Sequence, residues 1–396
     1  MKKILFIFGT RPEAIKLAPV VDQLKAHESY FKPIVCVTAQ HREMLDQVLN
    51  LFEITPNYDL NVMTNNQDLF DVTMRSLSRL KEVMENERPD LVIIQGDTTT
   101  SFVASLAAYY LKIPVAHVEA GLRTYNKYNP FPEEKNRHLT SVLADYHFAP
   151  TEWAKNNLLR ENVPQEKIWV TGNTVVDALL TILSRQRLVD RQKELNKYFR
   201  EKWNLTLPGD TEVDLDTNTD RAKLILVTGH RRESFGEDFK NICLALREIA
   251  QRNRRVTIVY PVHLNPNVQK SAYEILGPGQ LNYRSIFLIS PLDYDSFVYL
   301  MSKSYLVLTD SGGIQEEAPS LGKPVLVMRK TTERPEGIEA GAAKLVGIDK
   351  ESIVEETQKL LDNSESYEKM SKTVNPYGDG KAAGRVVAVL VSRYIN

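Results

Sequence analysis

Acidic side chains at the ends of apolar runs are the residues in this chain best suited to transfer protons. Asp97 and Glu119 each stand just beyond a short apolar run, and Glu133 and Glu134 follow in a loop. The carboxyl ends of parallel strands meet at one edge of an open α/β sheet, where ligands bind. Carboxylates crowded together there raise one another's pKa, as a general acid or base working near neutral pH requires. Each one alone is explained equally well as a helix cap or an ion-pair partner.

Two cations at the N-terminus of the first predicted helix indicate an anion-binding site. Thr10 and Glu13 have capping-box spacing and an apolar stripe follows them, so a helix begins after the strand at residues 4–8. Arg11 lies at this start and Lys16 about one turn further along. Both cations add to the positive end of the helix dipole, which favours an anion such as a diphosphate. The alternative is that both are solvated or pair with Glu13.

A second phosphate-binding pattern lies later in the chain. Ser311, Gly312 and Gly313 form a small-residue turn between an apolar run and a helical pattern. Phosphate can approach their amides because no bulky side chain blocks the way. Glu317, about one turn further, is suited to accept hydrogen bonds from vicinal hydroxyls such as those of ribose. His230 follows another apolar run with two arginines and is suited to hold a leaving-group phosphate, the alternative being a structural histidine.

The strands and helices that position these residues are predicted to form two successive βαβ arrays. Apolar runs, each followed by a turn and a helical pattern, predict buried parallel strands at 4–8, 33–37, 91–95, 115–118 and 146–149, and then at 224–227, 256–260, 286–289, 305–308 and 325–328. Two α/β domains are implied. Between the arrays, the polar and acidic stretch 195–223 is interpreted as a solvated loop rather than a metal site.

Composition excludes several classes of protein. The 396 residues carry 50 basic against 51 acidic side chains and no long basic run, so nucleic acid is not an expected partner. The two cysteines provide neither a disulfide framework nor a closely spaced thiolate pair for zinc, which fits a cytoplasmic protein. No apolar run is long enough to cross a membrane. Dinucleotide and P-loop motifs are missing as well, which argues against dinucleotide redox chemistry and P-loop hydrolysis, and no cluster of residues has the spacing of metal ligands.

Five of these segments occur together in the order found in one protein family. They are GTRPEA at 9–14, GDTTT at 96–100, HVEAGLR at 117–123, GHRRE at 229–233 and DSGGIQEE at 310–317. Together they resemble the non-hydrolysing UDP-N-acetylglucosamine 2-epimerases of bacteria, and the resemblance extends from Lys3 to the C-terminal helix. Residues 319–329 and 375–380 are most similar to the enzymes of enterobacterial common antigen and related surface polysaccharides.

The resemblance implies an architecture and a reaction. The architecture is the glycosyltransferase-B type, α/β with two Rossmann-like domains facing a cleft, usually as a homodimer. The first domain comprises residues 1–170, completed by a C-terminal helix at 379–396 that crosses back to it, and the UDP-binding domain comprises 171–378. The implied reaction interconverts UDP-N-acetylglucosamine and UDP-N-acetylmannosamine without cofactor or metal. UDP is eliminated to leave 2-acetamidoglucal and is then added back.

The resemblance also assigns roles, position by position. The catalytic positions are Asp97, Glu119, Glu133 and His230. The substrate-binding positions are Arg11, Lys16, Arg137, Leu292, Phe297, Ser311, Gly312, Gly313, Glu317 and Arg334. Some relatives bind a second, activating substrate molecule; Gln40, Glu43 and Gln67 lie in the matching segments, but Asn66 stands where those relatives tend to have arginine. Which carboxylate serves which face of C2 stays open.

Three other functions fit parts of the pattern. A hydrolysing epimerase would release free N-acetylmannosamine and UDP from the same glycal intermediate. A glycosyltransferase of the same architecture would bind nucleotide through the turn at residues 311–317 but pass the sugar to an acceptor. A non-catalytic sugar-nucleotide sensor would leave three separate carboxylate motifs without a purpose.

Overall fold

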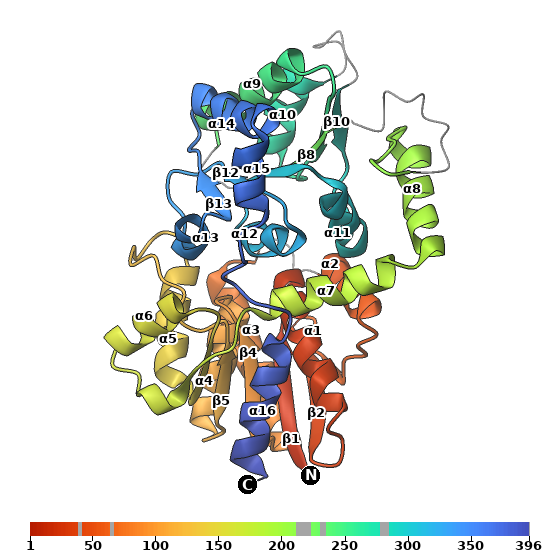
Figure 1. The fold of residues 1–396 in the computed structure, drawn as a ribbon. Coiled ribbons are helices and arrows are strands. Elements are labelled where there is room, and N and C mark those ends of the chain that lie inside the picture. Colours follow the sequence, from red (N-terminus) through yellow and green to blue (C-terminus); the bar gives the residue numbers. More distant parts are fainter. Residues whose placement is uncertain (39–41, 64–66, 211–222, 230–234, 278–284, 396) are drawn as a thin grey trace. The chain divides into compact units, whose positions relative to one another are not determined.

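The computed structural model describes residues 1–38, 42–63, 67–210, 223–229, 235–277 and 285–395 (Figure 1). The backbone divides into two compact units, Met1–Ala178 with Tyr377–Asn396, and Leu179–Pro376. The resemblance placed the domain boundary after residue 170, and in the structure the first unit extends to Ala178, which lies within helix α7 (Thr174–Gln186).

The first unit is built on a parallel sheet of seven strands in the order β3-β2-β1-β4-β5-β6-β7. The strands are β1 (Lys2–Phe8), β2 (Phe31–Val37), β3 (Tyr58–Asp59), β4 (Leu91–Gln95), β5 (Val115–Val118), β6 (Tyr146–Ala149) and β7 (Ile168–Val170). The five strands predicted in this half are confirmed, and β3 and β7 were not predicted. Continuous burial of residues 4–8 in β1 and 91–94 in β4 explains why these residues are uninterrupted apolar runs, because helices cover both faces of a parallel sheet.

Helices follow the strands of the first unit in turn. They are α1 (Arg11–Lys25), α2 (Arg42–Leu51), α3 (Leu69–Glu87), α4 (Thr99–Tyr110), α5 (Glu133–Leu143), α6 (Glu152–Arg160) and α7, with a 3₁₀ turn at Gln165–Lys167. The predicted start of α1 is confirmed, since Thr10 and Glu13 form a capping box there. Each strand therefore ends in a turn whose side chains lie at one edge of the sheet.

The last helix, α16 (Ala382–Tyr394), returns to the first unit, as predicted. It packs against α1 and buries Val386, Val387 and Leu390, and both termini of the chain lie at the same end of this unit (Figure 1). The Asp177 carboxylate accepts hydrogen bonds from the amides of Ala382 and Ala383 at 3.2 and 2.8 Å. Segment 171–177 therefore holds the start of the returning helix.

The second unit contains a parallel sheet of six strands in the order β10-β9-β8-β11-β12-β13. The strands are β8 (Lys223–Thr228), β9 (Val256–Pro261), β10 (Ile286–Ile289), β11 (Leu306–Thr309), β12 (Val325–Val327) and β13 (Ala343–Leu345), of which only β13 was not predicted. The helices are α8 (Val189–Trp203), α9 (Glu237–Arg252), α10 (Pro266–Leu276), α11 (Tyr294–Lys303), α12 (Gly312–Glu317), a 3₁₀ turn at Ala318–Leu321, α13 (Pro335–Ala340), α14 (Lys350–Asp362) and α15 (Ser364–Ser371).

The interpretation of residues 195–223 as a solvated loop is wrong for residues 195–203, whereas residues 204–210 lie in neither a helix nor a strand. Residues 195–203 belong to helix α8, where Leu195 and Phe199 are buried one turn apart. Asp210 is buried too and forms an ion pair with Arg200. Glu212, Asp214, Asp216 and Asp220 lie outside the described residues. Two apolar positions one turn apart are enough to bury one face of an otherwise polar helix.

Among the helices in the described parts of the chain, none combines the length and the apolar content needed to cross a membrane.

Candidate active site

A buried carboxylate joins the first two turns at the sheet edge of the first unit. Glu13 accepts hydrogen bonds from the amides of Gly9 and Thr10 at 3.0 and 2.8 Å with one oxygen. Its other oxygen accepts from the hydroxyls of Thr98 and Ser101 at 2.6 and 2.9 Å. Burial raises the pKa of this carboxyl, which the hydrogen bonds oppose. Glu13 therefore fixes the turn after β1 to the turn after β4.

Glu119 occupies the edge directly after β5. Its φ of 65° lies in the left-handed region, which residues other than glycine adopt rarely. The buried side chain forms an ion pair with Lys16 from α1 and accepts a 2.7 Å hydrogen bond from the Asn173 amide. The alternative that Lys16 is solvated or pairs with Glu13 is therefore wrong. The assignment of Lys16 to substrate binding stays a prediction.

Asp97 lies in the turn after β4, beside the turn that carries Glu119. Arg137 from α5 donates to its carboxylate from Nε at 2.8 Å and contacts the same oxygen from Nη2 at 2.7 Å. The Asn136 side chain donates to the Asp97 carbonyl at 2.9 Å, and Arg137 also contacts buried Glu134 at 3.2 Å. The structure therefore joins Asp97 and Arg137, two residues that the sequence predicted for the site.

Glu133 and Arg11 each occupy the first position of a helix. Glu133 begins α5 and is half-buried, and Arg11 begins α1 and is half-buried as well. A carboxylate is favourable at a helix N-terminus, whereas a cation gains nothing from the helix dipole there. Their predicted roles in catalysis and in substrate binding are compatible with these positions and stay predictions.

His117 of β5 contacts the turn after β4, and no role was assigned to it from the sequence. Its buried ring bonds to the Gly96 carbonyl through Nε2 at 2.8 Å, so Nε2 carries the proton and the ring fixes the turn that presents Asp97. His117 faces His147 of β6 as its partner in the parallel register. Burial lowers the pKa of His117 to about 4 and that of His147 to about 3, so both rings are neutral in the folded protein.

These two histidines predict that the protein loses stability in mild acid. In the unfolded chain a histidine has a pKa near 6.5, so below this pH the unfolded state binds protons that the folded state does not. The stability that the neutral rings provide is present above pH 6.5 and is lost progressively as the pH falls toward about 4 and 3. From pH 7.5 to 5.5 the free energy of unfolding should fall by about 1.4 kcal/mol for each histidine.

Urea unfolding at the two pH values measures this loss, and the variant His147→Gln is the comparison. The variant should lose about half of the pH dependence. The raised pKa values of Glu13 and Asp177 act in the opposite direction, but they do so in both proteins and cancel in the difference. An equal pH dependence in wild type and variant would contradict the prediction.

In the second unit, the predicted phosphate turn follows β11. Ser311 caps α12, and its amide donates to the Thr309 hydroxyl at 2.9 Å. Gly313 has open space where a Cβ would lie, whereas a Cβ on Gly312 would overlap the Arg334 guanidinium. Gly312 is therefore the residue that allows this cation to approach the turn.

Arg334 is buried in a cluster of four charged side chains. It contacts Glu316 at 2.7 Å and Glu333 at 2.6 Å, and Glu333 also pairs with Arg329 at 2.7 Å. Two cations and two carboxylates balance in charge, which is how buried ions are tolerated. These carboxylates hold the guanidinium beside the turn.

The expected ribose and uracil positions lie nearby in the same unit. Glu317 is buried, and the Tyr294 hydroxyl donates to its carboxylate at 2.7 Å. Leu292 is buried before α11, and Phe297 is half-buried on α11. These side chains are therefore ordered for binding, and their contacts with a nucleotide stay predictions.

Several predicted positions lie outside the described residues. These include His230 with its two neighbouring arginines, and Gln40 and Asn66 of the activation segment. Among the residues that the structure does describe, no group of three or more His, Cys, Asp or Glu side chains is placed to hold a metal ion.

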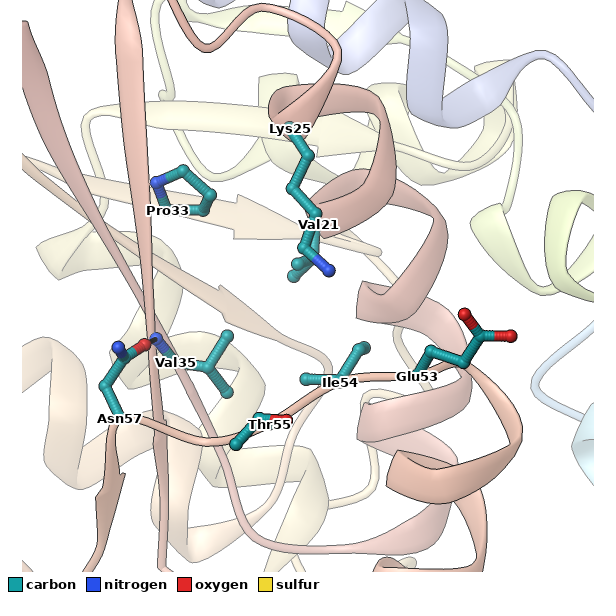
Figure 2. Close-up of a pocket in the computed structure, with 8 residues that line it drawn as sticks. All are labelled: Val21, Lys25, Pro33, Val35, Glu53, Ile54, Thr55 and Asn57. Atoms are coloured by element: carbon teal, nitrogen blue, oxygen red, sulfur yellow. Dashed lines mark hydrogen bonds between the residues drawn. The ribbon is translucent and has the colours of Figure 1, made fainter.

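The pocket in Figure 2 lies away from the candidate residues. It has a volume of about 290 Å³ and is lined by Val21, Lys25, Pro33, Val35, Glu53, Ile54, Thr55 and Asn57. A second pocket of about 550 Å³ is lined by residues around Tyr58 and Arg79. Neither pocket is lined by a predicted site residue. The candidate active site is therefore described by the side chains at the sheet edges.

Known proteins are similar to nearly the whole length of this chain. The family model described as UDP-N-acetylglucosamine 2-epimerase matches residues 22–391. The UDP-N-acetylglucosamine 2-epimerase of Campylobacter jejuni is 53% identical and covers 99% of this chain and 98% of its own length. That of Escherichia coli K12 is 53% identical and covers 100% of both.

Solved structures give the same result. The Neisseria meningitidis UDP-GlcNAc 2-epimerase bound to UDP-GlcNAc is 51% identical and superposes with a TM-score of 0.90, covering 98% of this chain and 100% of that one. The Methanocaldococcus jannaschii enzyme in complex with UDP-GlcNAc and UDP is 34% identical with a TM-score of 0.80, covering 98% and 99%.

Two parallel α/β units and these structural matches define a protein of the glycosyltransferase-B fold class. Within that class, the chain belongs to the UDP-N-acetylglucosamine 2-epimerase family and is an isomerase.

Proposed function

We propose that this protein interconverts UDP-N-acetylglucosamine and UDP-N-acetylmannosamine without hydrolysing them. The observation that carries the proposal is the pair of carboxylates at the sheet edge of the first unit, each held by a buried cation. Glu119 is paired with Lys16, and Asp97 with Arg137. Two carboxylates fixed in this way suit a reaction that removes a proton from one face of a carbon and returns one to the other.

The proposed chemistry begins at the bond between C1 and the UDP oxygen. The C2 proton of the intact sugar is barely acidic, but it becomes so as this bond breaks and positive charge develops at C1. Loss of the proton with both electrons of the C1–oxygen bond leaving on UDP gives 2-acetamidoglucal. Re-addition of UDP at C1 with protonation of C2 on the opposite face gives the epimer. Stabilising the departing diphosphate is therefore half of the catalysis.

Each unit supplies part of this task. In the first unit, Asp97, Glu119 and Glu133 are the candidate acids and bases, and Arg11, Lys16 and Arg137 are the candidate cations for the substrate. In the second, the amides of Ser311, Gly312 and Gly313 and the cations Arg334 and His230 are proposed to bind the diphosphate. Glu317 is proposed to bind the ribose, and Leu292 and Phe297 to lie on the uracil side.

NMR of the purified protein with UDP-N-acetylglucosamine in deuterated water tests the proposal without a coupling enzyme. The expected product is intact UDP-N-acetylmannosamine with deuterium at C2. Free N-acetylmannosamine as the main product would replace the proposal by a hydrolysing epimerase. No exchange at C2, with sugar transferred only when an acceptor is added, would replace it by a glycosyltransferase.

We propose further that the protein is a homodimer. Three neighbouring helices of the first unit, α3, α4 and α5, expose large apolar side chains, among them Phe70 at 75% and Val142 at 83%. Exposed apolar surface of this kind marks sites of protein association. Light scattering should give twice the chain mass of 45.1 kDa, and a mass of one chain at working concentration would reject the dimer.

The proposed pathway rests on resemblance to enzymes of enterobacterial common antigen and related surface polysaccharides. UDP-N-acetylmannosamine made in the cytoplasm would feed such a polymer. Deleting the gene should remove the polymer from the cell surface, and supplying the Escherichia coli relative should restore it. An unchanged polymer in the deletion strain would separate the enzyme from this pathway.

A further inference from the structure

Asn173 is a buried residue that no motif of the sequence singled out. It follows β7 and precedes α7, and its side-chain amide donates to Oε2 of Glu119 at 2.7 Å. Its Oδ1 accepts a hydrogen bond from the amide of Val175 at 3.1 Å. Because a backbone N–H requires an acceptor, this second bond fixes the orientation of the Asn173 amide and directs its nitrogen at the carboxylate.

The backbone of Asn173 contacts the returning chain. The backbone N–H of Asn173 donates to the carbonyl of Tyr377 at 2.6 Å, and Tyr377 is fully buried. Beside it, Gly172 and Gly378 pack so closely that a Cβ on Gly172 would lie 3.4 Å from the Gly378 Cα. One residue therefore connects the carboxylate of Glu119 with the point where the C-terminal segment rejoins the first unit.

The two described donors to Glu119 both contact the same oxygen. Lys16 and Asn173 bond to Oε2, and among the described residues no donor contacts Oε1. An oxygen that holds two donors is stabilised as an acceptor, so the proton that Glu119 takes or gives is carried on Oε1. The donors also prevent rotation of the carboxylate, which keeps Oε1 in one direction.

We propose that Asn173 is a positioning residue for Glu119, whose side-chain amide holds the direction of this carboxylate. The inference rests on the proposed epimerase reaction, in which Glu119 transfers a proton at C2. Asn173 itself does not transfer a proton. It acts through Glu119, so its loss should change turnover more than substrate binding.

The pair of variants Asn173→Asp and Asp177→Asn tests this with matched chemistry. Asn173→Asp keeps the size of the side chain, but it removes the donor and places a second carboxylate beside Glu119. Two carboxylates at this distance cannot both be ionised, so the acid limb of the pH profile of kcat should move up by at least about one unit. Asp177→Asn weakens the cap of α16 without touching Glu119.

The charged groups around Glu119 are the same in both variants. They are Lys16 from α1 and the pair of Asp97 and Arg137, and His117 is neutral. A shift of the acid limb that occurs only in Asn173→Asp therefore reports the new carboxylate. Asp177→Asn should lower the melting temperature and leave the pH profile in place.

A third variant, Asn173→Ala, keeps the backbone bond to Tyr377 and removes only the side-chain donor. Its kcat should fall about tenfold to hundredfold, with KM for UDP-N-acetylglucosamine within about threefold of wild type. Thermal unfolding checks that each variant is folded before its kinetics are measured.

The outcomes separate the inference from the proposed function. A wild-type protein that does not epimerise would remove the proposed function. An active wild type with unchanged kcat and pH profile in Asn173→Asp and Asn173→Ala would overturn the positioning role alone. Equal losses of kcat in the variants at 173 and 177 without a shifted pH limb would show that Asn173 is only structural.

Discussion

Replacing Glu119 by glutamine should lower kcat by about three orders of magnitude, the usual cost of losing a general acid or base. Glutamine has the shape of glutamate but cannot take up a proton. The buried Lys16 loses its anionic partner in this variant, and an unpaired buried cation is costly, so the variant should also melt at a lower temperature. Epimerisation followed by NMR gives kcat.

Binding of UDP should be nearly unchanged in the same variant, because the predicted diphosphate turn belongs to the second unit. Isothermal titration with UDP measures this. Glu161→Gln is the matched control, since it makes the same chemical change in the first unit, where Glu161 pairs with Arg123 at 2.8 Å. The control should lose stability and keep kcat within about twofold. A kcat for Glu119→Gln within threefold of wild type would remove Glu119 from proton transfer.

Most of the strands that could be predicted from the sequence are buried on both faces, although the partly buried edge strand β10 was predicted from its apolar run as well. Residues 4–8 of β1 and 91–94 of β4 are uninterrupted apolar runs because helices cover both sides of the sheet. The three strands that were not predicted, β3, β7 and β13, have two or three residues each and all lie at the edge of a sheet. An edge strand is covered less completely, so it needs no continuous apolar run and leaves little pattern to detect.

Helix α8 shows a second limit of sequence pattern. Its composition is mostly polar, and the interpretation as a loop followed from that average. The burial depends on Leu195 and Phe199 one turn apart, with Trp203 against Phe199 at 5.4 Å between ring centroids. A test of spacing in place of average polarity would have found the helix.

The positions of the candidate site residues at the sheet edge could be predicted, but the ion pairs that they form could not. Strand ends followed by acidic and basic residues place Asp97, Glu119 and Lys16 at one sheet edge. The partner of each charge depends on helices that the turns bring together, such as α5, which carries Arg137 to Asp97. Asn173 escaped notice because it follows β7, the strand that was itself missed.

Gly121→Ala should destabilise the protein by about 3 kcal/mol or more. Gly121 is buried two residues after Glu119, and its φ of 93° lies in the region that favours glycine. A Cβ there would overlap the Ala154 carbonyl oxygen and would lie 3.1 Å from the Leu158 Cγ. Both neighbours belong to α6, so the clash meets a helix backbone that cannot rotate away as a side chain does.

Gly384→Ala is the matched control for this variant. Gly384 lies exposed in α16 with open space around the position of a Cβ, and alanine favours a helix over glycine by up to about 1 kcal/mol. The control should therefore raise the free energy of urea unfolding while Gly121→Ala lowers it. If Gly121→Ala had the same free energy of unfolding as wild type, α6 would have to move to make room for the methyl group. The same turn carries Glu119, so kcat should then fall although the stability is normal. Normal stability together with normal kcat would contradict the packing described for this turn.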